Sequence, residues 1–100
     1  MAITDEILKE FKDRMHLSDE EDDNLRRILS ASNKALKSMC GDYDILIDEE
    51  FKELVFERSR YVYNDALEYF NDNFLSSINN LNIAKALEGI TVEGDVDATI

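Results

Sequence analysis

The chain has 100 residues, and its hydrophobic content of 44% suits one domain with a single modest core and argues against wholesale disorder. Its 23 acidic and 11 basic residues give a net charge of −12, so the chain repels nucleic acid and anionic membranes rather than recruiting them. No apolar run approaches the roughly eighteen residues of a membrane span and no secretory leader is recognisable, so we expect a protein made and used inside a cell.

The first predicted helix covers residues 4–15, with Thr4 as its cap. Its apolar side chains share one face: Ile7, Leu8, Phe11 and Met15. His16 follows at the helix end. No second histidine accompanies it, so we expect a surface or capping residue rather than a metal ligand.

A second helix is predicted over residues 18–40, because Ser18 and Glu21 have the spacing of a capping box. The acidic residues that open it complement the helix dipole, and they point around more than one turn, so they cannot converge on a cation. Gly41 is placed to end the helix. Cys40, the only cysteine, cannot form an internal disulfide and is expected to be a small buried side chain.

The linker before the third helix resembles a calcium loop only weakly. Asp42, Asp44 and Asp48 are suitably spaced, but Ile47 occupies the position where such a loop needs glycine. We therefore expect no metal site here and no cofactor anywhere in the chain.

The third predicted helix is the longest and covers residues 48–73, with Asp48 as its cap. One apolar stripe recurs at helical spacing: Phe51, Leu54, Val55, Val62, Ala66, Tyr69 and Phe70. An adjacent face carries Phe56, Tyr63, Leu67 and Phe74. This apolar surface is wider than one packing partner needs, so we expect the helix to be buried on two sides.

After residue 73 the helical pattern weakens, because asparagine competes for backbone hydrogen bonds. The segment is either a continued or kinked helix or an extended arm. We divide the chain into a helical domain, residues 1–87, and an acidic tail, residues 88–100, which is either mobile or a strand that docks on a partner. The fold class is therefore all-α, a small helical bundle built around one long helix.

The sequence has no nucleophile elbow, phosphate loop or paired metal-ligand motif, so we do not expect an enzyme. Four residues in the middle of the long helix are candidates for a subunit interface: Arg58, Arg60, Tyr61 and Tyr63. Arg58 lies on the apolar stripe and requires either a carboxylate partner or a path to solvent. That partner belongs either to the same domain or to the acidic surface of a neighbouring copy. An ordinary core role for the two tyrosines is equally open.

Two segments carry a resemblance to a known family. They are EEDDNL at the start of the second helix and the run LVFERSRYVYNDALEYFNDNFLSSINNLNI. In these segments the chain resembles the head-tail connector, or adaptor, proteins of long-tailed bacteriophages that infect Gram-positive bacteria. The resemblance covers about residues 4–84 and is most specific over residues 57–78.

The resemblance implies a structural protein of the virion neck, made in the cytoplasm of the bacterial host. Its partners would be the portal protein, a stopper or tail-completion protein and further copies of itself, in a ring of about twelve on the portal. The ring would join the DNA-filled head to the tail and extend the exit tunnel, whose acidic wall lets DNA pass without binding.

Two other functions fit the sequence. An acidic DNA mimic would inhibit a nucleic-acid-binding enzyme and would carry its acids in a spaced stripe resembling phosphates. Here the acids cluster at helix starts, which favours the simpler role of complementing helix dipoles. A small helical regulator would instead form a stable dimer through the long helix.

Overall fold

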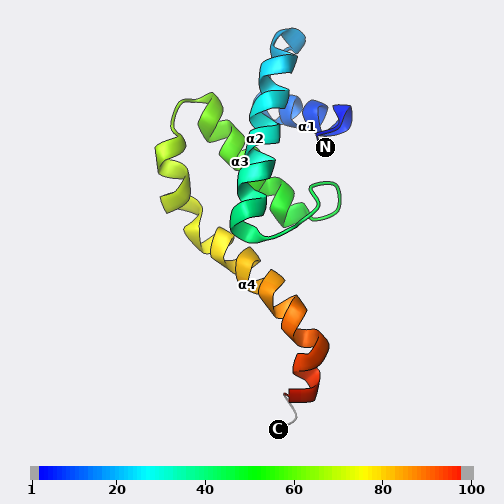
Figure 1. The fold of residues 1–100 in the computed structure, drawn as a ribbon. Helices are drawn as coiled ribbons and strands as arrows, with labels where there is room; N and C mark the ends of the chain where they lie inside the picture. Colours follow the sequence, from blue (N-terminus) through cyan, green and yellow to red (C-terminus); the bar gives the residue numbers. More distant parts are fainter. Residues whose placement is uncertain (1–2, 98–100) are drawn as a thin grey trace.

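The computed structural model describes residues 3 to 97, except for the side chains of Asp19 and of residues 89 to 97. Its elements are α1 (Asp5–Met15), the 3-10 turn η1 (Asp19–Glu21), α2 (Asp22–Cys40), α3 (Glu49–Tyr63), the 3-10 turn η2 (Leu67–Tyr69) and α4 (Phe70–Asp97). No strand occurs between residues 3 and 97, and the predicted all-α bundle is confirmed. Figure 1 shows a compact body from which α4 projects.

Two of the three predicted helix caps are confirmed. The Thr4 hydroxyl accepts a hydrogen bond from the Ile7 amide (3.2 Å), and the Asp48 carboxylate accepts one from the Phe51 amide (2.9 Å). The predicted capping box is wrong: Ser18 makes no side-chain cap bond, and α2 begins only at Asp22, after η1. The reason is that the Glu21 carboxylate accepts a hydrogen bond from the Tyr63 hydroxyl (2.7 Å) instead.

The single long helix predicted over residues 48–73 is also wrong, because α3 ends at Tyr63. Asp65 adopts a left-handed conformation (φ 58°), and its amide and that of Ala66 donate to the carbonyls of Val62 (3.0 Å) and Tyr61 (2.8 Å). These bonds satisfy the last carbonyls of the helix, and aspartate tolerates this conformation better than most residues. The chain therefore reverses and runs back along α3.

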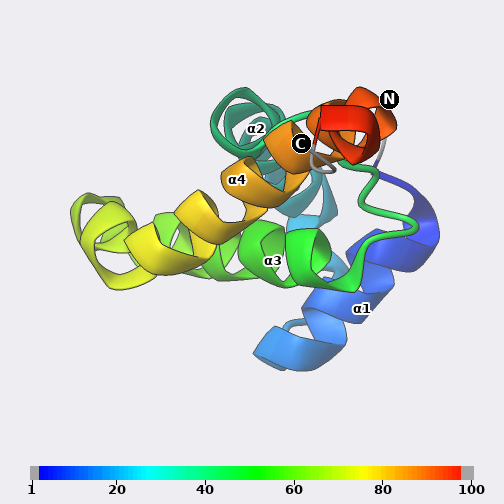
Figure 2. The same ribbon diagram turned by 90° about the horizontal axis from the view of Figure 1, so that it is seen from below.

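The reversal packs Phe70 and Phe74 against Tyr61 at the end of α3. Phe70 is fully buried, and its ring lies 5.7 Å from Tyr61 and 5.0 Å from Phe74. Such edge and offset ring pairs contribute beyond the area they bury. The second apolar face of α3 is thus covered by α1 and by the following segment of the same chain, as Figure 2 shows for α4 lying beside α3.

The core lies where α1, α2 and α3 meet. Phe11 of α1 and Phe56 of α3 are fully buried, with ring centroids 5.4 Å apart. The remaining fully buried apolar side chains are Leu25, Leu29, Leu36, Cys40, Ile45, Phe51, Val55 and Phe70. Cys40 is buried, as predicted, and burial raises the pKa of its thiol. His16 ends α1 in a left-handed conformation (φ 59°), in agreement with its predicted capping role.

α4 is kinked at Phe74 (φ −120°, ψ 16°), and hydrogen bonds tie the part that follows the kink to the body. The Tyr43 hydroxyl donates to the Leu81 carbonyl (2.6 Å), and the Asn82 amide donates to the Met39 carbonyl (2.7 Å). Beyond these contacts α4 leaves the body (Figure 1), and the molecule is 58 Å long by 27 Å and 18 Å.

The sequence predicted a mobile tail or a strand from residue 88 onward. In the structure the backbone from residue 88 is helical up to Asp97. A helix satisfies its backbone groups within the segment, whereas a strand needs a neighbouring strand. The last predicted tail residues, 98 to 100, lie outside the described part.

Two ionic contacts join α1 to α3 beside the core. The Arg14 guanidinium donates to both carboxylate oxygens of Glu53 (2.8 and 2.6 Å), and the Lys52 ammonium lies 2.9 Å from Glu10. The hydrogen bonds from Arg14 lower the pKa of Glu53 below its ordinary value of 4.5.

Because this pKa is lowered in the folded state, the Arg14–Glu53 contact stabilises the fold fully above about pH 4.5 and is lost as the pH falls through the folded pKa. The Glu53 side chain is 49% exposed, so we expect Glu53→Gln to lower the free energy of unfolding by only about 0.5–1 kcal/mol at pH 7. In urea denaturation at a series of pH values, the difference should shrink as the pH falls below about 4.5 and vanish once the pH is below the lowered pKa of Glu53. Glu68→Gln, at an exposed position, is the matched control, and an equal effect there would contradict the assignment.

Candidate functional site

Arg58 is the interface candidate with the least complete pairing. Its side chain is half-buried against α2, and its guanidinium donates to the buried hydroxyl of Ser32 (3.1 Å). It forms no ion pair with any side chain that the structure describes, and burial lowers its pKa. Of the two alternatives that the sequence left open, a carboxylate partner or a path to solvent, the described side chains do not supply the first.

The other three candidates have partners in the same chain. Arg60 pairs with Glu57 (2.6 Å), and its guanidinium lies 5.2 Å from the centre of the Tyr61 ring. Tyr61 packs edge-on against Phe74 (5.8 Å) and accepts a hydrogen bond from Asn73 (2.9 Å).

The fourth candidate, Tyr63, binds Glu21, and this hydrogen bond raises the pKa of the tyrosine. The four candidates thus contact different neighbours. Arg58 contacts α2, Arg60 pairs with Glu57 of its own helix, Tyr61 contacts α4 and Tyr63 contacts the turn before α2. The structure does not gather them into one patch, and their role between subunits stays a prediction.

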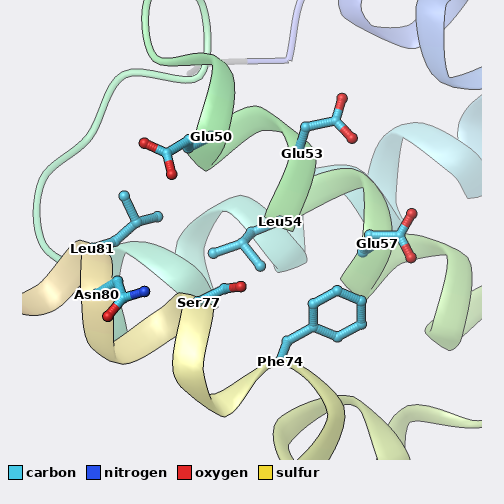
Figure 3. A pocket seen from close by; sticks show the side chains of 8 residues that line it. All are labelled: Glu50, Glu53, Leu54, Glu57, Phe74, Ser77, Asn80 and Leu81. Atoms are coloured by element: carbon cyan, nitrogen blue, oxygen red, sulfur yellow. The ribbon is translucent and has the colours of Figure 1, made fainter.

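A groove between α3 and α4 is a feature that the sequence analysis missed. It has a volume of about 460 Å³, and Figure 3 shows α3 on one side and α4 on the other. Its lining residues are Glu50, Glu53, Leu54, Glu57, Phe74, Ser77, Asn80 and Leu81. Leu54 and Leu81 are buried and form an apolar floor, and three glutamates of α3 line one wall.

The three glutamates of the groove differ in their pairing. Glu53 is held by Arg14 and Glu57 by Arg60, whereas Glu50 is exposed and has no ion pair within the described residues. Glu50, Leu54 and Glu57 follow the spacing of one helical face, which is the signal that could have indicated this wall from the sequence. The facing wall could not be foreseen, because it depends on the chain reversal after Tyr63.

A basic stripe lies on the face of α2 opposite its buried side. It consists of Arg27 and Lys34, with Ala31 between them, and all three are exposed. Neither Arg27 nor Lys34 forms an ion pair in the described part of the chain. Apart from Arg58, every other basic residue there forms one. In an otherwise acidic protein this stripe is a local positive surface.

The projecting helix α4 exposes large apolar side chains. Ile83 is 55% exposed and Leu87 is 51% exposed, on the side of the helix away from the buried Ile78 and Leu81. Exposed apolar side chains on a projecting helix are typical of contacts with other proteins.

The aspartates of the linker, predicted not to bind calcium, cap the backbone. The Asp44 carboxylate accepts from the Leu46 amide (2.9 Å), and Asp48 caps α3. Among the described residues there is no group of three side chains suited to holding a metal ion. In the same part of the chain, no helix combines the length and apolarity needed to cross a membrane.

Comparison of the chain with protein-family models, with curated proteins and with solved structures gave no match. The surfaces described above and the resemblance of the two sequence segments are the features that bear on function.

Proposed function

We propose that the chain is a structural head-tail connector of a long-tailed bacteriophage, which forms a ring beneath the portal and extends the DNA exit tunnel. The observation that carries the proposal is the projecting helix α4, with Ile83 and Leu87 exposed beyond a well-packed body. A helix of this kind suits an arm that docks in an apolar groove of the portal or of a neighbouring subunit.

The charge of the chain supports the same function. A net charge of −12 per copy gives a ring with a strongly negative tunnel, and repulsion between its acids and DNA phosphates decays over about 8 Å at physiological salt. DNA can then pass along the wall without adhering to it. The mechanism is geometric, and many weak contacts in one ring add up to stable attachment.

The direct test is deletion of the gene from the parent phage, with the gene supplied in trans. We expect the deletion to yield DNA-filled heads and unattached tails by electron microscopy, and complementation to restore joined, infectious particles. Intact particles in the absence of the gene would overturn the proposal.

Ile83→Glu tests the role of α4 in that assay. Because Ile83 is exposed, we expect the free energy of unfolding to change by no more than about 0.5 kcal/mol, while joined particles fall at least about tenfold. Ala84→Glu is the matched control, since Ala84 is also exposed but points about 100° away around the helix. Equal joining by the two variants would show that this side of α4 does not dock.

A further inference from the structure

The chain covers the wide apolar surface of α3 itself: α2 and α4 pack against α3, and Phe11 of α1 contacts Phe56. A ring therefore needs another pair of surfaces. Closed rings form through heterologous contacts, in which two different patches of one chain meet. The acidic groove and the basic stripe are two such patches.

We propose that the α3/α4 groove of one copy binds the basic stripe of α2 from the next copy. This inference deepens the proposed ring and rests on it. The occupant of the groove is thus a second copy of this chain, recognised by charge and by the spacing of side chains on two helices.

The two patches have the same spacing. Along α3 the order is Glu50, Leu54, Glu57, and along α2 it is Arg27, Ala31, Lys34, so in each helix a central apolar residue lies four residues after the first charge and three before the second. The outer charges are separated by seven residues, or about 10.5 Å of helix, in both cases. Two helices laid side by side can therefore form both charge pairs at once.

The central residues favour close approach. Ala31 is small and exposed, and it would face the floor of the groove at Leu54. A small residue at a helix crossing lets a second helix come near, and the charged side chains at either end then reach across. Figure 3 shows Glu50 and Glu57 at the two ends of the α3 wall, with Leu54 between them.

The charges needed for this contact are available in the free chain. Arg27, Lys34 and Glu50 have no ion pair with the side chains that the structure describes, so three of the four partners give up no described pair. Glu57 uses one carboxylate oxygen for Arg60, and a carboxylate can accept from two cations. At physiological salt the remaining acids of the two copies are screened beyond about 8 Å, whereas the paired charges are in contact.

Charge reversal tests the pairing. One variant reverses the groove (Glu50→Lys with Glu57→Lys), and the other reverses the stripe (Arg27→Glu with Lys34→Glu). We expect each variant alone to lose self-association and particle joining at least about tenfold, and an equimolar mixture of the two to regain both. In the mixture, every reversed groove can meet a reversed stripe. Glu68→Lys with Asp72→Lys, at exposed positions, is the matched control and should behave like the wild type.

Chemical crosslinking detects the contact between the groove and the basic stripe without relying on phage assembly. A carbodiimide joins a lysine amine to a carboxylate in direct contact, so a mixture of ¹⁵N-labelled and unlabelled wild-type chains should give mixed-isotope peptides that link Lys34 to Glu50 or Glu57. The groove assignment would be overturned if these peptides were absent. It would also be overturned if the reversal variants associated and joined particles as the wild type does. The deletion phenotype would still establish a connector in that case. Conversely, the crosslink without a deletion phenotype would leave a self-associating protein that is not a connector.

Discussion

Phe56→Ala is expected to lower the free energy of unfolding by about 3–5 kcal/mol, which is the largest effect we predict for a single substitution. The Phe56 ring is fully buried, contacts Phe11 at 5.4 Å and carries the Arg14 guanidinium 5.1 Å from its centre. Removing it leaves a cavity where α1 meets α3. A domain of this size has a total stability of about 5–15 kcal/mol, so the variant should be partly unfolded near body temperature.

Urea denaturation followed by circular dichroism measures this loss. Hydrogen exchange should also show that α1 loses protection first, because the Phe11–Phe56 contact joins it to α3. Tyr69→Ala is the control: Tyr69 is 59% exposed, and its removal should change stability by about 0.5 kcal/mol or less. A loss below about 1 kcal/mol for Phe56→Ala would show that this ring is not part of the packed core.

Gly41→Ala is expected to destabilise the fold by about 1–3 kcal/mol through backbone strain, with a further cost from a steric clash. Gly41 has φ 119° and ψ 179°, a conformation that is nearly confined to glycine. A β-carbon added there would lie 2.6 Å from Cγ of Lys85, whose ammonium is 4.3 Å from the centre of the Tyr43 ring. The substitution therefore strains the end of α2 and pushes α4 away from Tyr43.

Two measurements separate these effects. Thermal unfolding reports the total loss, and hydrogen exchange over residues 78 to 88 reports whether α4 is loosened. Ser38→Ala, an exposed change in the same helix, should alter stability by about 0.5 kcal/mol or less. Unchanged stability of Gly41→Ala would mean that residue 41 does not require the glycine conformation in solution.

The two substitutions test the parts of the fold that position the proposed surfaces. Tyr43 ties the linker to α4 through the Leu81 carbonyl, and Leu81 is also part of the groove floor. Loosening α4 should therefore widen the groove, and it should also release the projecting part of α4 from the body. We expect Gly41→Ala to weaken assembly for this reason, even where most of the chain stays folded.

The helices that the sequence predicted correctly are those whose signals are local. Thr4 and Asp48 cap their helices through their own side chains, and the apolar spacing of the first two helices needs only one buried face. The length limited the prediction to one domain, and the helical spacing of the apolar residues indicated the all-α class. These features depend on residues within a few turns of one another.

The errors arose where distant residues compete with a local signal. Apolar spacing alone continued the third helix to residue 73, but packing of Phe70 and Phe74 against Tyr61 favours a reversal at Asp65. Ser18 and Glu21 have the right spacing for a capping box, but Tyr63, which is 42 residues away from Glu21, takes the carboxylate. Neither competitor is visible in a short window of sequence.

The sequence by itself determined the class of the fold, the two side-chain caps, the burial of Cys40 and the acidic character of the surface, because each follows from local spacing or from composition. Only the tertiary structure decided that α3 stops at Tyr63, that Arg58 meets a serine rather than a carboxylate, and that α4 returns along α3 to form the groove. These outcomes depend on contacts between residues far apart in the chain, and such contacts are set by the packing of the whole domain.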